Sequence, residues 1–286
     1  MKFDYYKYHA LGNDYIVIDP QKNDIELNER NIKLICHRNY GIGSDGILYG
    51  PIFDSRNDIH LRIFNPDGSE AEKSGNGIRE FSKYLFEAKY VKNNTFWLKT
   101  LGGNVKVTIL DDFAKKIKVN MGVPTFVSKD IPTLFEDRES INKILVVDGQ
   151  KYVVSCVSIG NPHCVMLVND LSEINIKDIG PKIENHVNFP NKINVQFMKI
   201  LDRHNIQIEI WERGAGYTLA SGTSSCAAAS VAYKLNLVDN NINVHMPGGI
   251  ININYDEQGS IDMTGDVTSV GYGFFSQELL EQKVKI

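Results

Sequence analysis

The sequence predicts an α/β (α+β) fold made of two repeated, pseudo-symmetric domains, and an internal repeat is the main observation behind this prediction. The segments IHLRIFNPDGSEAEKSGNG, from Ile59, and IQIEIWERGAGYTLASGTS, from Ile206, share one pattern. Each begins with the alternation of apolar and polar residues that is typical of a half-buried strand. In each, a serine follows the first isoleucine at the same distance, from 59 to 74 and from 206 to 221. Both serines, Ser74 and Ser221, then open a run of helical character.

Further segments match in the same order at nearly the same offset. Upstream, Gly12 of GNDYIVI and Gly160 of GNPHCVMLV lie 148 positions apart, close to the 147 between the two serines. Downstream, LGGNVKVTI corresponds to PGGIININY, and IKVNMG corresponds to IDMTG. Ordered matches at one offset indicate that a unit of roughly 145 residues is duplicated.

Each unit is expected to contain several strands and one principal helix. The helices are expected over residues 76–91 and 223–236, with turns at NPDG, LGGN, PGGI and DEQG between the strands. The first domain is expected over residues 1–122, rejoined by about 274–286, and the second over 123–273. In a protein of two such units, the cleft between them is the natural place for a small-molecule site.

Composition and charge limit the classes of function. Hydrophobic residues make up 42% of the chain, charged residues 23%, and the net charge is -4, as in ordinary soluble globular proteins. No basic block favours nucleic acid or a membrane as a partner, and no signal-peptide core or apolar stretch of membrane-spanning length is visible. The four cysteines lack CxxC spacing, so reduced thiols and a cytoplasmic location are expected. Neither metal-ligand spacing nor a phosphate-binding glycine motif occurs.

A serine that precedes a helix has two possible meanings. As an N-cap it satisfies a backbone N–H of the first turn, which is worth about 1 kcal/mol. In a binding site, the same helix start offers N–H groups and the positive end of the helix dipole to an anion. Two such starts that face one another across a cleft would hold a carboxylate from both sides. Composition and spacing leave both meanings open.

The sequence resembles the diaminopimelate epimerase family over essentially its whole length. The resemblance rests on six ordered segments: HALGNDYIVID, GIGSDGIL, RIFNPDGSEAEKSGNGIR, GNPHCV, INVQF and WERGAGYTLASGTSSCAAA. It implies two domains, each with a mostly antiparallel sheet wrapped around a central helix, and an active site in the cleft between them. The implied enzyme is a homodimer that interconverts LL- and meso-diaminopimelate by two-base proton transfer, without cofactor or metal, in lysine and cell-wall precursor biosynthesis.

In that family the positions of Ser74 and Ser221 are occupied by the catalytic cysteine pair, so serine at both is a departure. A thiol has an ordinary pKa of about 8.5, and a helix-end effect of at most ~2 kcal/mol lowers a pKa by about 1.5 units. An alcohol starts near bulk water, at ~15.7, and stays protonated under the same effect. The chain is therefore expected to bind the substrate at an intact site and to lack epimerase activity.

Serine at both positions has two explanations. The chain is either a Cys→Ser double variant that holds substrate without turning it over, or a natural relative that binds without epimerising. The intact substrate contacts favour the first, because a drifting natural relative would be expected to lose them as well.

Four further residues are assigned by the resemblance to the distal amino-acid end of the substrate, the end that does not react. They are Asn65, Asn161, Asn194 and Arg213. An arginine can bind a carboxylate through two parallel hydrogen bonds. Each of the four also has a structural explanation, since asparagine is common in turns and an arginine can be a surface charge.

The reacting end is assigned to a second set. Asn13 and Glu212 match positions near the α-amino group, and Glu212 and His163 belong to the catalytic set with the two serines. A structural role for His163 is equally consistent with the sequence. Backbone N–H groups that would receive the α-carboxylate, which gains negative charge as the proton leaves, belong to Gly75, Asn76, Gly222 and Thr223.

Two smaller departures concern the choice of substrate. Gly46 stands where some family members carry glutamine, and Tyr217 stands where glutamate is usual. A racemase of another amino acid, such as histidine, is therefore an alternative, as is a natural binding protein without catalysis. The four distal-end residues argue against the racemase, because a substrate without a second amino-acid group would not need them.

Overall fold

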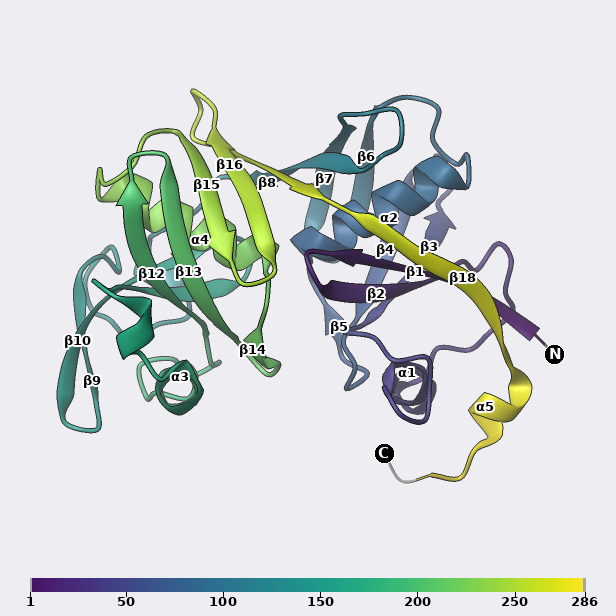
Figure 1. The fold of residues 1–286 in the computed structure, drawn as a ribbon, viewed down its shortest axis with the longest axis horizontal. Coiled ribbons are helices and arrows are strands. Elements are labelled where there is room, and N and C mark those ends of the chain that lie inside the picture. Colours follow the sequence, from purple (N-terminus) through teal and green to yellow (C-terminus); the bar gives the residue numbers. More distant parts are fainter. Residues whose placement is uncertain (1, 285–286) are drawn as a thin grey trace. The chain divides into compact units, whose positions relative to one another are not determined.

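The computed structural model describes residues 2–284 of the chain (Figure 1). The chain forms two compact units. Unit 1 consists of Met1–Val119 and Gly265–Ile286, and unit 2 consists of Asn120–Thr264. The domain boundaries expected from the sequence, at residues 122 and 273, stay a prediction.

Unit 1 is built on one twisted sheet. Its strands are β1 (Lys2–Ala10), β2 (Asn13–Ile18), β3 (Ile47–Phe53), β4 (Ile59–Phe64), β5 (Glu70–Ala71), β6 (Thr95–Thr100), β7 (Gly103–Ile109), β8 (Lys116–Gly122) and β18 (Thr268–Ser276). They pair in the order β18-β1-β2-β3-β4-β6-β7-β8, and β5 also pairs with β4. The pairs β2–β3 and β4–β6 are parallel, and the others are antiparallel.

Unit 2 repeats this arrangement. Its strands are β9 (Lys143–Val147), β10 (Gln150–Ser158), β11 (Pro162–Leu167), β12 (Asn194–Asp202), β13 (Asn205–Glu212), β14 (Gly216–Thr218), β15 (Asn241–Met246), β16 (Gly249–Tyr255) and β17 (Ile261–Asp266). They pair in the order β9-β10-β11-β12-β13-β15-β16-β17, with β14 on β13. The parallel pairs, β11–β12 and β13–β15, occupy the same places as in unit 1. The predicted duplication is therefore present in strand order and strand direction.

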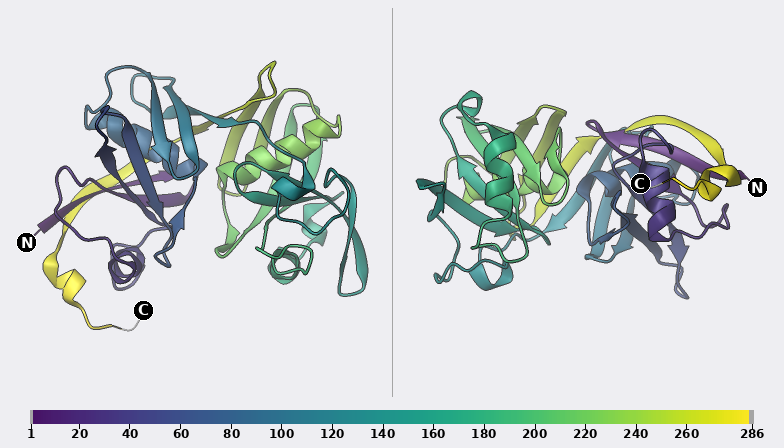
Figure 2. Two further views of the ribbon diagram at one scale, coloured as in Figure 1. Left: turned by 180° about the vertical axis from the view of Figure 1, so that it is seen from behind. Right: turned by 90° about the horizontal axis from the view of Figure 1, so that it is seen from below.

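Each unit wraps its sheet around one central helix. Helix α2 (Gly75–Glu87) packs on β1, β2, β3 and β7, and helix α4 (Gly222–Lys234) packs on β10 to β13, β15 and β16 (Figure 2). Helix α4 is buried along most of its length, as its alanine, serine and cysteine residues predict. No helix in residues 2–284 combines the length and the apolar composition needed to cross a membrane.

Three shorter helices were not expected from the sequence. They are α1 (Glu29–Cys36), α3 (Ile176–Glu184) and α5 (Gln277–Glu281). Helix α1 covers the face of the unit 1 sheet opposite to α2, where its Ile32 and Ile35 pack with Ile16 and Ile18 of β2. Because successive side chains of a strand point to opposite faces, β2 is buried on both sides and directs Tyr15 and Val17 toward α2.

The central helices end earlier than the sequence predicts, at Glu87 and Lys234 rather than at residues 91 and 236. Both end in the same way, with a left-handed residue just after the helix: Lys89 has φ 63° and Asn236 has φ 57°. The next N–H groups turn back to carbonyls of the last turn, Tyr90 to Leu85 and Leu237 to Ala232 (2.9 Å each), as in a Schellman motif.

Candidate functional site

The two predicted serines cap the two central helices. Ser74 Oγ accepts the N–H of Gly77 (3.1 Å), and Ser221 Oγ accepts the N–H of Ser224 (3.4 Å). The N-cap explanation is therefore confirmed at both. The first N–H groups of a helix have no acceptor within the helix, which makes a helix start suited to an anion.

In unit 1, Asn13 and Asn76 of the predicted set lie together at the start of α2. Asn76 Nδ2 donates to Asn13 Oδ1 (2.9 Å), and Asn13 Nδ2 donates to Asp45 Oδ2 (2.9 Å). Arg79, fully buried one turn into the helix, donates to Asn76 Oδ1 (2.9 Å). The side chain of Asn76 is therefore held from both sides beside Ser74.

Unit 2 contains the equivalent arrangement. Asn161, the repeat counterpart of Asn13, donates through Nδ2 to Thr223 Oγ1 (3.4 Å). Thr223 is the second residue of α4, as Asn76 is of α2. The repeat predicted from spacing thus extends to one side-chain contact at each helix start.

His163 lies beside Asn161 in the interior of unit 2. Its Nε2 is 2.9 Å from Asn161 Oδ1, and the side chain is fully buried. Burial, with a contribution from the Arg213 charge, lowers the pKa of His163 to about 3, while Gln196 opposes the shift. The imidazole is therefore neutral near pH 7 and acts there as a polar contact. A catalytic role for His163 stays a prediction.

Arg213 follows β13 in a loop that buried groups hold in place. Asn194, buried at the start of β12, donates to the carbonyl of Pro162 (2.8 Å) and accepts the backbone N–H of Arg213 (3.0 Å). Glu184 of α3 accepts from Trp211 Nε1 (2.7 Å) and from the next backbone N–H of the loop (2.9 Å). Within residues 2–284, no carboxylate lies at ion-pair distance from the Arg213 guanidinium, whose hydrogen bond is to the carbonyl of Asn191 (3.4 Å).

The four distal-end residues are divided between the units. Asn161, Asn194 and Arg213 belong to unit 2, and Asn65 lies in unit 1, in the turn after β4. There Asn65 Nδ2 donates to Ser69 Oγ (2.9 Å), which is the turn role expected for an asparagine. Glu212, the repeat counterpart of Asn65, is half-buried at the end of β13.

The structure explains glycine at position 46. A Cβ on Gly46 would lie 2.5 Å from the carbonyl oxygen of Phe64 and 2.6 Å from Cε1 of Tyr15. Real Cβ atoms do not approach other atoms so closely, so a glutamine at this position would require both the Phe64 backbone and the Tyr15 ring to move.

Tyr217, the other departure, contacts residues that are not part of the predicted site. Its hydroxyl donates to Glu209 Oε2 (2.8 Å), and Lys177 Nζ lies 5.5 Å from the ring centroid. Burial and the Glu209 carboxylate raise the pKa of Tyr217 to about 12, so the phenol is neutral near pH 7. Tyr217 thus does not supply the negative charge of the usual glutamate.

Sequence reasoning missed one residue at a helix start, Tyr15. Its hydroxyl oxygen lies 3.2 Å from Ser74 Oγ. A signal was available, because aligning Gly12-Asn13 with Gly160-Asn161 places Tyr15 opposite His163. A tyrosine in a strand is ordinarily a packing residue, so the sequence alone gives no reason to assign Tyr15 to the site.

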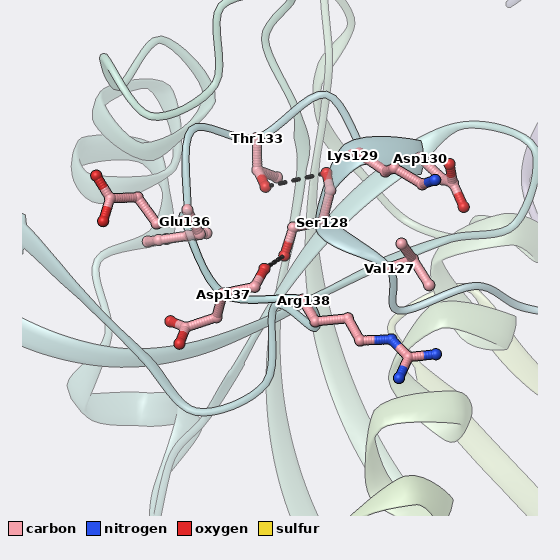
Figure 3. A pocket seen from close by; sticks show the side chains of 9 residues that line it. Val127, Ser128, Lys129, Asp130, Thr133, Glu136, Asp137 and Arg138 are labelled. Carbon is pink, nitrogen blue, oxygen red and sulfur yellow. Dashed lines mark hydrogen bonds between the residues drawn. The ribbon is translucent and has the colours of Figure 1, made fainter.

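A separate cavity of about 620 Å³ lies in unit 2 (Figure 3). It is lined by Val127, Ser128, Lys129, Asp130, Thr133, Phe135, Glu136, Asp137 and Arg138. Hydrogen bonds from Ser128 Oγ to the Asp137 carbonyl (2.6 Å) and from Thr133 Oγ1 to the Ser128 carbonyl (3.4 Å) hold its wall together. None of the predicted site residues lines it. In the described part of the chain, no group of three His, Cys, Asp or Glu residues could hold a metal ion.

Comparisons with known proteins agree with the resemblance. A family model described as diaminopimelate epimerase matches residues 5–127 and 155–270. Diaminopimelate epimerase 2 of Nostoc sp. (strain PCC 7120) is 52% identical over 279 residues, which cover 98% of this chain and 97% of the relative. Diaminopimelate epimerase of Desulfitobacterium hafniense is 37% identical over 279 residues, covering 96% and 98% of the two chains.

Solved structures share the fold at low sequence identity. A hydroxyproline epimerase from Agrobacterium vitis has a TM-score of 0.71 at 14% identity, covering 96% of this chain and 91% of its own. A methylitaconate-delta-isomerase has a TM-score of 0.61 at 12% identity, covering 96% and 95%. These likenesses confirm the predicted fold class.

Proposed function

The chain belongs to the diaminopimelate epimerase family, a family of isomerases, and we propose that it binds LL- and meso-diaminopimelate through the starts of α2 and α4. The observation that carries this proposal is the equivalence of the two helix starts. Each has a capping serine and an asparagine bonded to the second helical side chain, Asn13 to Asn76 and Asn161 to Thr223. At each start, the backbone donors suit a carboxylate.

The proposed division of roles follows from these contacts. The N–H groups of Gly75, Asn76, Gly222 and Thr223 receive the α-carboxylate, and Asn13 and Glu212 face the α-amino group. Arg213, whose charge no carboxylate of the described chain neutralises, binds the distal carboxylate together with Asn65, Asn161 and Asn194.

The proposed chemistry is proton transfer at the α-carbon without a cofactor. Backbone donors that hold the α-carboxylate stabilise the charge that develops as the proton leaves. Inversion needs a competent base on each side of the carbon, and Ser221 offers an alcohol only. We therefore expect substrate binding without conversion of LL- to meso-diaminopimelate. A cytoplasmic location and a role in lysine biosynthesis are part of this proposal.

Calorimetric titration tests the substrate. We expect both diaminopimelate isomers to bind, and we expect L-lysine, which lacks the second carboxylate, to bind more weakly. Hydrogen bonds to a charged group contribute about 1.5–3 kcal/mol, which corresponds to a loss of roughly 10- to 150-fold in affinity. L-Histidine serves as the control for the racemase alternative. Tighter binding of histidine than of diaminopimelate would replace the proposed substrate.

We also propose that the chain forms a homodimer through β18. This strand pairs along one edge with β1, and three of its alternate side chains are exposed: Val270 (56%), Tyr272 (85%) and Phe274 (55%). Large apolar and aromatic side chains gathered on one face of a strand are typical of a protein interface. A second copy of the same strand face would cover them symmetrically.

The dimer is tested by analytical ultracentrifugation of the unaltered chain and of Tyr272→Lys. A lysine at the centre of the patch would place unpaired charge in the interface, so we expect the variant to sediment as a monomer. Tyr40→Lys is the matched control, because Tyr40 is an exposed tyrosine (51%) of unit 1 outside the patch. Monomeric sedimentation of the unaltered chain, or a dimer in which Tyr272→Lys and Tyr40→Lys behave alike, would contradict the proposal.

A further inference from the structure

Tyr15 and Ser74 bring two hydroxyl groups together at the start of α2. Their oxygen atoms are 3.2 Å apart, and Ser74 Oγ also accepts the N–H of Gly77 (3.1 Å). The Tyr15 side chain is buried, whereas Ser74 is half-buried. Ser74 is therefore the member of this pair that a ligand at the helix start can touch, and Tyr15 stands behind it.

The position of the phenol is built into the unit. The backbone N–H of Tyr15 donates to Glu80 Oε2 of α2 (3.1 Å) in the buried interior, which fixes β2 against the helix. The absence of a side chain at Gly46 leaves space for the ring, because a Cβ there would lie 2.6 Å from Cε1 of Tyr15. The sequence thus leaves room for a phenol at this place. The hydroxyl of a serine at position 74 is a better hydrogen-bond partner for this phenol than the thiol of a cysteine, because sulfur forms weak hydrogen bonds.

The two helix starts differ in this respect. In unit 2 the repeat counterpart of Tyr15 is His163, which is hydrogen bonded to Asn161. Ser221 is buried, and in residues 2–284 its Oγ has a hydrogen bond from the Ser224 N–H but none with a phenol, imidazole or carboxyl group. Among the described residues, only the capping serine of unit 1, Ser74, is therefore paired with a more acidic group, the phenol of Tyr15.

Positive charge lies beside the pair at the start of α2. An ordinary phenol has a pKa of about 10, against ~15.7 for the water that an alcohol resembles. The positive end of α2 points at the pair, and the fully buried Arg79 adds a cation bonded to Asn76 and to the Gly75 carbonyl. Burial raises the pKa of Glu80 well above its usual range, which favours the neutral carboxyl and limits its repulsion of a phenolate.

We propose that Tyr15 acts through Ser74 as a proton relay at one face of the substrate α-carbon. The C–H bond breaks, and its proton forms a bond to Ser74 Oγ. The Ser74 O–H proton passes at the same time to the Tyr15 phenolate oxygen. The electron pair of the C–H bond stays on the α-carbon and its carboxylate. Tyr15 is a positioning and proton-accepting residue that reaches the substrate only through Ser74.

This inference rests on the proposed function and adds a stereochemical consequence. The α-hydrogens of the LL isomer and of the D-centre of the meso isomer point to opposite faces. A relay on one face can remove the hydrogen of only one of them, and it returns deuterium from the solvent to the same face. We expect solvent exchange with retention of configuration, from one isomer only, and no inversion.

The experiment follows α-deuterium incorporation into LL- and meso-diaminopimelate in heavy water by mass spectrometry, and measures binding by calorimetry in parallel. Tyr15→Phe should lower the exchange by at least roughly 100-fold, the usual contribution of a positioned acid–base group, while affinity is unchanged. In the Tyr15→Phe background, Ser74→Cys should restore exchange, because a thiol does not need the phenol. Tyr255→Phe is the matched control, since Tyr255 forms a buried hydroxyl pair with Ser230 (2.5 Å) on α4.

The outcomes separate the relay from the binding proposal. Equal exchange in Tyr15→Phe and Tyr255→Phe would overturn the relay, as would failure of Ser74→Cys to rescue the Tyr15→Phe variant. Exchange from both isomers at similar rates, or binding of diaminopimelate without any exchange, would overturn the relay and leave the proposed function standing. If neither isomer binds, the proposed function fails and the relay fails with it.

Discussion

Replacing Ser74 and Ser221 together by cysteine should raise the rate of conversion of LL- to meso-diaminopimelate by roughly 10²- to 10⁴-fold, the range of a positioned acid–base group. Both positions cap a central helix, so a thiol at either would lie at the positive end of a helix dipole. A helix-end effect of at most ~2 kcal/mol lowers a thiol from its ordinary pKa of about 8.5 into the working range. The backbone donors of both starts are already in place.

The single variant Ser74→Cys is the control for this prediction. Inversion removes a proton on one face and delivers one on the other, so Ser74→Cys alone, which leaves only an alcohol at position 221, should gain far less than the pair. Circular dichroism of LL-diaminopimelate solutions measures the conversion directly, with thermal unfolding to show that the variants are folded. Rapid inversion by the unaltered chain would contradict the two-thiol account, and so would a double variant as inactive as Ser74→Cys.

The fold was predictable because the repeat can be recognised from the spacing of residues along the sequence. Two alternating strands, each followed by a serine at the same distance, indicate a duplicated strand and helix start. In the structure the equivalent strands of the two units share their order and direction. The ends of the helices were not predictable. Lys89 and Asn236 adopt positive φ after α2 and α4, and a lysine in that conformation leaves no local signal such as a glycine would.

The residues assigned to the site from the sequence stay a prediction, and their side-chain contacts could not be predicted from the sequence. Spacing placed Asn13 and Asn161 at matching points of the repeat, and the structure adds that each bonds the second side chain of a helix. The Tyr15–Ser74 contact could not be read from spacing, because it joins residues 59 positions apart through the packing of β2 on α2. The burial that keeps His163 neutral is likewise a property of the folded unit.

The second large effect is expected at Arg213. Arg213→Ala should weaken diaminopimelate binding by about 2–3 kcal/mol, roughly 30- to 150-fold, as loss of one partner of a desolvated charge pair does. The loop would keep its shape in the variant, because Asn194 and Glu184 hold it through the backbone N–H groups of residues 213 and 214. The lost affinity would then report the guanidinium itself. Calorimetry with meso-diaminopimelate is the measurement.

Two further variants test whether the lost affinity comes from the Arg213 guanidinium. Arg213→Lys keeps the charge and loses the planar pair of donors, so an affinity between those of the unaltered chain and Arg213→Ala would indicate two parallel hydrogen bonds to a carboxylate. Arg203→Ala is the matched control, because Arg203 is an exposed arginine of unit 2 bonded to Asp239 (2.7 Å). L-Lysine should bind Arg213→Ala and the unaltered chain alike, since it has no distal carboxylate to lose. An unchanged affinity for diaminopimelate in Arg213→Ala would remove Arg213 from the site and with it the main reason for assigning a substrate with two amino-acid ends.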